Sequence, residues 1–126
     1  MFRLTVQAEF CAAHALTIGG EREPLHGHNW RVEAVVEGPD LDADGLLCDF
    51  HAVEAALAGV IEPLDNADLN QAPPLAGLNP TTENVARVIC DGLAAALEGV
   101  LPVGARVARV TVTEAPGCRA EYQPEP

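Results

Sequence analysis

Three histidines are spaced so that neighbouring strands could bring them together as metal ligands. His26 and His28 lie two residues apart in the stretch HGHNW, and His14 lies twelve residues before the first of them. Residues i and i+2 of a strand share a face, so both imidazoles can approach one ion, and Gly27 leaves room between them. Three imidazoles leave a tetrahedral zinc ion one open position, which is typical of catalytic sites. The alternative is that each histidine has an ordinary core or surface role.

Alternating apolar and polar residues predict the two strands that carry these histidines. Apolar side chains occupy the even positions of residues 2–14, and the alternation resumes over residues 28–36. Two consecutive strands most simply pair antiparallel, so the end of the first meets the start of the second. The three histidines are therefore expected to converge at one edge of the sheet. Residues 15–25, which include a Gly-Gly pair and a proline, are expected to form a loop.

Two helices and two more strands complete a predicted element order of β-β-α-α-β-β. Asp49 can cap a helix that ends before Pro63, and Thr81 can cap a second, amphipathic helix. The Pro- and Asn-rich stretch between the helices is expected to be irregular. A third strand is predicted over residues 105–114, and CRAEY is predicted to form a short final one. The chain is thus expected to be a single α+β domain over residues 1–126.

Glu114 ends the predicted third strand on the same face as the apolar residues Val110 and Val112. A carboxylate on that face would be buried, which is costly unless a donor or a cation meets it. Such a group could accept hydrogen bonds from a ring N–H and an adjacent amino group, as in guanine or a pterin. The alternative is that the strand frays at Thr113 and leaves Glu114 in solvent.

Composition excludes several classes of protein. Nineteen acidic against seven basic residues give a formal net charge of −12, and no basic run could follow a phosphate backbone, so nucleic acid is not an expected partner. We find no signal peptide and no apolar stretch near the roughly 20 residues that cross a bilayer, so a cytoplasmic protein without membrane contact is expected. The four cysteines form no C-x-x-C pair and are expected to be buried free thiols.

Six spaced motifs together resemble the 6-pyruvoyltetrahydropterin synthase family, which includes the bacterial 6-carboxytetrahydropterin synthases of queuosine synthesis. They are FCAAHAL, LHGHNWRVE, CDF, LDNADLN, NPTTENVA and VTVTEAPGCRAEY, in the family's order and over nearly the whole chain. The resemblance implies a T-fold, in which subunits of this element order assemble around a barrel. It also implies a homo-oligomer, typically a hexamer, with active sites at subunit interfaces.

The resemblance further implies which residues bind ligands. It places zinc on the three histidines, His14, His26 and His28. It makes Glu114 the anchor of a pterin-like ring. Additional ring contacts would come from the start of the second helix, at Thr81, Thr82 and Glu83.

Two parts of the family's proton-transfer apparatus are missing. The family has a cysteine a few residues before HGH, but GGEREPLHGH contains none. The family's LDH element reads LDN here, which keeps Asp65 but replaces the histidine with Asn66, whose amide cannot transfer protons near neutral pH. Some relatives use a glutamate in place of the cysteine, so Glu23, or less favourably Glu21, could act as the base near zinc. The alternative is an ordinary solvated loop glutamate, and Cys11, on the opposite face of its strand, is a poor substitute.

Three functions remain open for such a chain. It could be a zinc-dependent lyase that breaks a carbon–oxygen or carbon–carbon bond of a reduced pterin by an altered route, with Glu23 or Asp65 transferring protons. It could catalyse the standard synthase reaction on dihydroneopterin triphosphate, but this activity is expected to be weak or absent. It could also bind a pterin-like ligand without turnover and with an empty metal site.

Overall fold

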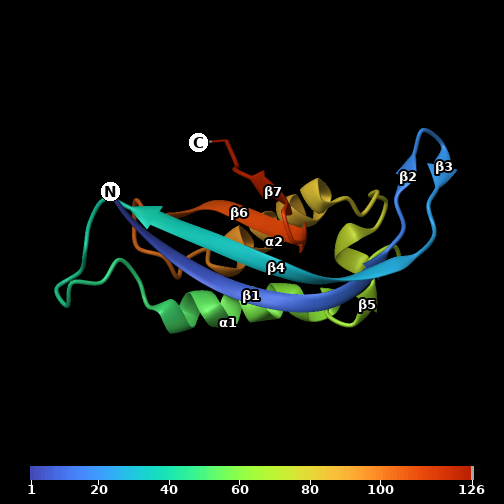
Figure 1. Cartoon of the computed structure of the whole chain (residues 1–126). Helices are drawn as coiled ribbons and strands as arrows, with labels where there is room; N and C mark the ends of the chain where they lie inside the picture. The colour runs from blue at the N-terminus through green and yellow to red at the C-terminus, as the bar shows by residue number, and fades with distance from the viewer. Residues whose placement is uncertain (126) are drawn as a thin grey trace.

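A five-stranded sheet with two helices across one face forms the fold (Figure 1). The computed structural model describes residues 1–125. The strand order is β5-β1-β4-β6-β7, and every neighbouring pair is antiparallel except β5 and β1. The strands of this sheet are β1 (Phe2–His14), β4 (His26–Gly38), β5 (Ala67–Asp68), β6 (Arg106–Ala115) and β7 (Cys118–Tyr122). The predicted α+β class is confirmed.

The long hairpin of β1 and β4 positions the histidines. The two strands pair over their full length, from Phe2 opposite Gly38 to His14 opposite His26. The predicted loop between them is partly wrong, because it contains a small hairpin of β2 (Thr17–Ile18) and β3 (Glu21–Arg22). Its Gly-Gly turn has positive φ at both residues, as a two-residue type I′ hairpin turn requires. Strands of two residues are too short for alternation to reveal them.

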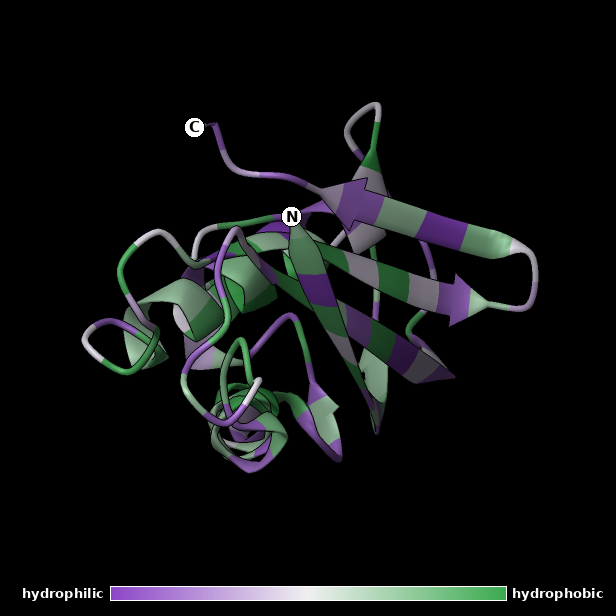
Figure 2. Ribbon diagram, turned by 90° about the vertical axis from the view of Figure 1, so that its left-hand side faces the viewer, coloured by the Kyte–Doolittle hydropathy of each residue, from purple (hydrophilic) through white to green (hydrophobic). Residues whose placement is uncertain are grey.

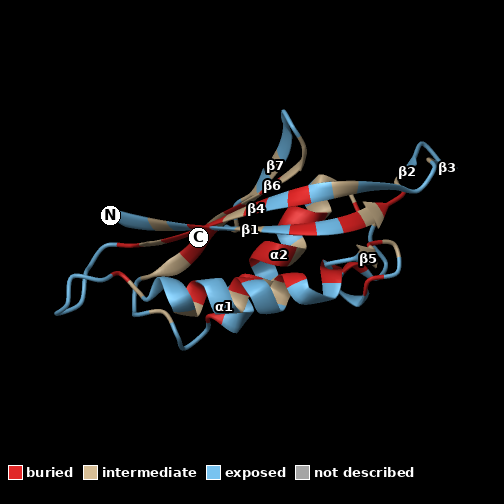
Figure 3. Cartoon of the chain, turned by 60° about the horizontal axis from the view of Figure 1, so that its bottom comes forward, coloured by how far each residue is buried: buried red, intermediate tan, exposed pale blue. Residues whose placement is uncertain are grey.

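Both predicted helices are present and cover the same face of the sheet (Figure 3). Helix α1 (Phe50–Ile61) begins at Asp49, whose side chain accepts the His51 backbone N–H. Helix α2 is Thr82–Ala96. The stretch between the helices is mostly irregular, but it contains the 3₁₀ turns η1 (Glu62–Leu64) and η2 (Pro73–Leu75) as well as β5.

The core lies between this sheet face and the helices. Hydrophilic and hydrophobic bands alternate along the strands, so one face is apolar (Figure 2). The largest fully buried side chains include Trp30 from β4 and Leu93 from α2. Among the described residues, His14 is the one buried polar side chain, and it lies at the end of this core. No helix in residues 1–125 is long and apolar enough to cross a membrane.

The four cysteines are free thiols, as predicted, but the expectation that all are buried is wrong. Cys90 is buried within α2, and burial raises its pKa to about 11. Cys48 is half-buried. Cys11 and Cys118 are exposed, because the first lies on the open sheet face and the second at the start of the edge strand β7.

Candidate functional site

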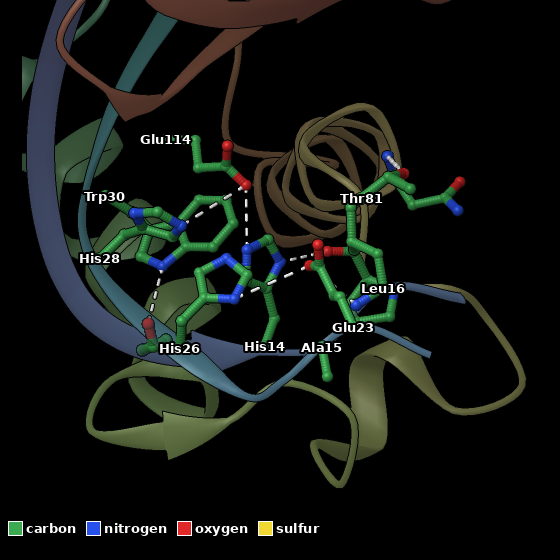
Figure 4. Close-up of polar contacts among 12 residues, drawn as sticks. His14, Ala15, Leu16, Glu23, His26, His28, Trp30, Thr81 and Glu114 are labelled. Carbon is green, nitrogen blue, oxygen red and sulfur yellow. Dashed lines mark hydrogen bonds and ion pairs between the residues drawn. The ribbon is translucent and has the colours of Figure 1, made fainter. Parts of the chain in front are cut away.

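The closed end of the β1–β4 hairpin brings His14, His26 and His28 into one cluster (Figure 4). One ring nitrogen of each residue lies within 4.8 Å of the corresponding nitrogens of the other two. The rings meet edge to face, with centroids 4.7 to 5.2 Å apart. His14 is fully buried, His28 is half-buried and His26 is exposed, so the cluster opens toward solvent on one side.

Hydrogen bonds fix which nitrogens of the cluster are free. Nδ1 of His14 donates to the Pro80 carbonyl at 2.8 Å, and Nδ1 of His26 donates to the Pro24 carbonyl at 2.9 Å. A carbonyl only accepts, so each neutral ring keeps its lone pair on Nε2. The Nε2 atoms of His14 and His28 are buried without a hydrogen-bond partner. Burial also lowers the pKa of His28, which favours its neutral form. Neutral imidazoles with free lone pairs are what a metal ion requires, so the cluster could hold one.

Trp30 forms the floor of the site, a role that the sequence analysis did not assign. It is fully buried, and its Nε1 donates to the Ala12 carbonyl at 3.1 Å. Its ring lies edge to face with His14 and His28, at centroid distances of 4.9 and 5.6 Å. The sequence signal for this role was its position in HGHNW, two residues after His28 and therefore on the same face of the strand.

Glu114 lies against the histidine cluster. Its Oε1 is 2.9 Å from Nε2 of His14 and 3.8 Å from Nε2 of His28 (Figure 4). The shorter contact is not aligned as a hydrogen bond, since that nitrogen has no hydrogen-bond partner. Strand β6 continues to Ala115, so the alternative in which it frays at Thr113 is wrong. The side chain is 24% exposed, which is neither full burial nor free solvation.

Glu23 is also held beside the cluster, at the base of the small hairpin. Its Oε1 accepts the Leu16 backbone N–H at 3.1 Å, and its own N–H donates to the Leu16 carbonyl at 2.9 Å. The same oxygen lies 3.8 Å from Nδ1 of His26. Glu21 is exposed on β3. Of these two glutamates, Glu23 is therefore the one with a fixed position next to a histidine.

Asp65 lies elsewhere and supports the backbone of β1. Its Oδ1 accepts the Cys11 backbone N–H at 3.0 Å, and the Asn66 N–H donates to the Cys11 carbonyl at 2.6 Å. In the described part of the chain, no hydrogen bond or ion pair joins Asp65 to His14, His26 or His28. A single chain therefore does not bring Asp65 to the cluster. Cys11 points away from the cluster, and its thiol donates to Asn29 on the open face.

The start of α2 is tied to the cluster through the Pro80 carbonyl. Thr81 caps the helix, since its hydroxyl accepts the Asn84 N–H at 3.1 Å. Thr81 and Thr82 are half-buried and Glu83 is exposed in the first turn. These three residues therefore line the helix end that faces the site, but the Thr81 hydroxyl already has a structural partner.

Replacing Thr81 with alanine is expected to lower the free energy of unfolding by about 1 kcal/mol, because the Asn84 N–H loses its cap. Thr81→Ser keeps the hydroxyl and should lose at most a small part of this. Urea denaturation followed by circular dichroism measures both variants. Equal stability of the alanine variant and the parent chain would contradict a capping role.

The chain is similar to several known proteins in sequence and in fold. The sequence pattern of 6-pyruvoyl tetrahydropterin synthase matches residues 3–125. The dihydroneopterin monophosphate aldolase of Pyrococcus furiosus is 39% identical over 97 residues, which are 77% of this chain and 79% of that protein. The 6-carboxy-5,6,7,8-tetrahydropterin synthase of Bacillus subtilis is 30% identical over 129 residues, covering 98% and 86%. The 6-pyruvoyl tetrahydropterin synthase structure from Caenorhabditis elegans superposes with a TM-score of 0.83 at 20% identity, covering 98% and 96%, which confirms the predicted T-fold.

Proposed function

The chain belongs to the 6-pyruvoyl tetrahydropterin synthase family, and from this premise we propose that it is a metal-dependent lyase that breaks a carbon–carbon bond in the side chain of a reduced, phosphorylated pterin. The observation that carries the proposal is the fixed position of Glu23 next to His26 of the histidine cluster, in a chain without the family's cysteine. The similarity to a dihydroneopterin monophosphate aldolase supports this reaction class. A Plasmodium vivax relative of the same fold has been studied as a variant in which a catalytic glutamate is replaced by alanine, which supports a glutamate base.

His14, His26 and His28 would hold the metal, which we propose to be zinc. When bound, zinc would supply a Lewis acid that polarises the side-chain oxygens of the substrate. Trp30 closes the floor of the site and keeps water from that side. The carbonyls of Pro80 and Pro24 orient the His14 and His26 rings, because each accepts the Nδ1 proton.

Glu23 is the proposed general base. It would take the proton from a side-chain hydroxyl of the substrate, after which the adjacent carbon–carbon bond breaks and the hydroxyl carbon becomes an aldehyde. The electron pair of that bond passes to the carbon attached to the pterin ring, where conjugation with the ring delocalises it. Return of the proton to that carbon gives a hydroxymethyl pterin and balances the reaction. The Leu16 N–H bond holds the Glu23 carboxylate in place for both transfers.

Ring recognition is proposed to use Glu114, Thr81, Thr82 and Glu83. Glu114 carries a carboxylate that can accept from two adjacent ring donors, and the other three lie at the start of α2. Asp65 remains a proposed proton-transfer residue that a neighbouring subunit could bring to the site. We also propose a homo-oligomer, such as the hexamer that the family implies. One edge of β1 is open to pairing with another chain, because β5 pairs with β1 only at Ala12 and Ala13.

The direct test is to incubate zinc-supplemented protein with dihydroneopterin monophosphate and, separately, with the triphosphate. Products are followed by chromatography with fluorescence detection, together with an assay for the released aldehyde. We expect a hydroxymethyl pterin and one aldehyde per turnover, and loss of both after chelator treatment. A pterin product whose side chain has lost its phosphate but keeps all its carbon atoms would indicate the standard synthase reaction instead. Substrate that binds but stays unchanged would favour a pterin-binding protein without turnover.

A further inference from the structure

We propose that Glu114 is a fourth ligand of the metal in the substrate-free protein, completing a set of three imidazoles and one carboxylate. This inference rests on the proposed metal site. It starts from the position of one atom, Oε1 of Glu114, which lies 2.9 Å from Nε2 of His14 and 3.8 Å from Nε2 of His28. These are the nitrogens that the cluster leaves without hydrogen-bond partners.

The contact between Glu114 and His14 joins two acceptors. The Pro80 carbonyl takes the Nδ1 proton of His14, so Nε2 of the neutral ring carries a lone pair. An ionised carboxylate offers only lone pairs as well. Two such atoms 2.9 Å apart repel unless a cation lies between them or beside both. His14 is fully buried, so its side of the contact is closed to water, and a proton or a metal ion shared by the two atoms would relieve the repulsion.

The distances favour the metal ion. Zinc binds nitrogen and carboxylate oxygen at about 2.0 to 2.2 Å, so ligand atoms of a tetrahedral site lie about 3.3 to 3.5 Å apart. The observed 2.9 and 3.8 Å to His14 and His28 lie on either side of that separation, and the carboxylate would shift toward His26 to share one ion with all three rings. A proton on His14 alone would account for the shorter contact, but not for the orphaned Nε2 of His28 near the same oxygen.

The backbone holds Glu114 within reach of the cluster. Strand β6 pairs with β4 up to Thr113 opposite Arg31, close to the start of β4 where His28 lies. Glu114 follows directly and directs its carboxylate at the histidines (Figure 4). The fourth position would then be closed in the substrate-free protein. A bound substrate must take the place of Glu114, and the released carboxylate becomes available to the pterin ring.

The experiment uses Co²⁺ in place of zinc, because its visible absorption reports the number and type of ligands. The parent chain is compared with Glu114→Gln and with Glu21→Gln, which removes an exposed carboxylate of the small hairpin outside the proposed ligand set. We expect a shifted cobalt spectrum only in Glu114→Gln. Its Zn²⁺ affinity, measured by competition with a chelating dye, should fall at least 10-fold, in the range of about 10- to 100-fold that supporting groups of a metal site control.

Two further measurements keep the test decisive. Azide should bind to cobalt readily in Glu114→Gln and poorly in the parent chain, because the carboxylate closes the fourth position. Glu114→Asp keeps the charge but shortens the side chain, so it should shift the cobalt spectrum in the same direction. It replaces the glutamine variant in the test if that variant folds poorly. Identical spectra, zinc affinity and azide binding in the parent and Glu114 variants would overturn the proposal while leaving the three-histidine site intact. A parent chain that takes up no cobalt would overturn the metal site and this inference together.

Discussion

Replacing His28 with alanine is expected to reduce bound zinc from about one ion per chain to less than a tenth of that after dialysis against a weak chelator. The His28 ring contributes one of three converging ring nitrogens, and its loss leaves an incomplete imidazole set. The half-buried ring can be removed with less disturbance of the core than fully buried His14. Metal content is measured by mass spectrometry on protein purified without chelator.

His51 provides the matched control for this variant. It is the fourth histidine of the chain, and its exposed side chain lies beside Asp49 at the start of α1, outside the cluster. His51→Ala should therefore keep full zinc content. Circular dichroism of both variants separates metal loss from unfolding. Equal zinc content in His28→Ala and the parent chain would rule out this cluster as the metal site.

The fold was largely predictable because its main signals are local and periodic. The alternation over residues 2–14 predicts a strand, and β1 has these bounds, with its even positions buried or half-buried from Leu4 onward. Asp49 and Thr81 cap the helices as predicted, since capping depends on a few adjacent residues. The β2–β3 hairpin and β5 were not predicted, because segments of two residues have no periodicity. Strand β5 also depends on pairing with β1, which is distant in the sequence.

The candidate site was predictable only in part. Convergence of the histidines followed from the antiparallel pairing of β1 and β4, which sequence order makes the simplest arrangement. The contact of Glu114 with His14 could not be predicted in this way, because it depends on the pairing of β6 with β4. The hydrogen bond between Leu16 and Glu23 was not predictable either, because the unpredicted β2–β3 hairpin creates it.

Asn66 shows why the family's missing histidine leaves the backbone intact. Its φ is +56°, which makes it the one described residue other than glycine with positive φ. Asparagine, aspartate and histidine are the non-glycine residues that most often adopt this conformation. An exchange of histidine for asparagine therefore preserves the turn that holds Cys11, while it removes an imidazole that could transfer protons. We propose that this proton-transfer role falls to Glu23, which its hydrogen bond to Leu16 holds next to His26.

Replacing Glu23 with glutamine is expected to lower kcat for pterin cleavage by about 10²- to 10⁴-fold, the usual contribution of a general base. Glutamine has the same shape, and its carbonyl oxygen can still accept the Leu16 N–H, so the small hairpin should keep its position. Only the ability to take a proton is lost. Pterin affinity, measured by fluorescence titration, should therefore change little, and the loss should appear in kcat rather than in KM.

Glu21→Gln is the control for this prediction, because Glu21 lies two residues away on the same hairpin but is exposed. It removes the same charge from the same segment and should leave kcat within about twofold of the parent value, as expected for a surface substitution. If Glu23→Gln turns over as fast as the parent chain, the Glu23 carboxylate serves only to hold Leu16 and the base lies elsewhere, with Asp65 of a neighbouring subunit as the next candidate. Loss of pterin binding along with kcat would instead assign Glu23 to substrate binding, because a group that acts only as a base contributes to the transition state and not to the ground-state complex.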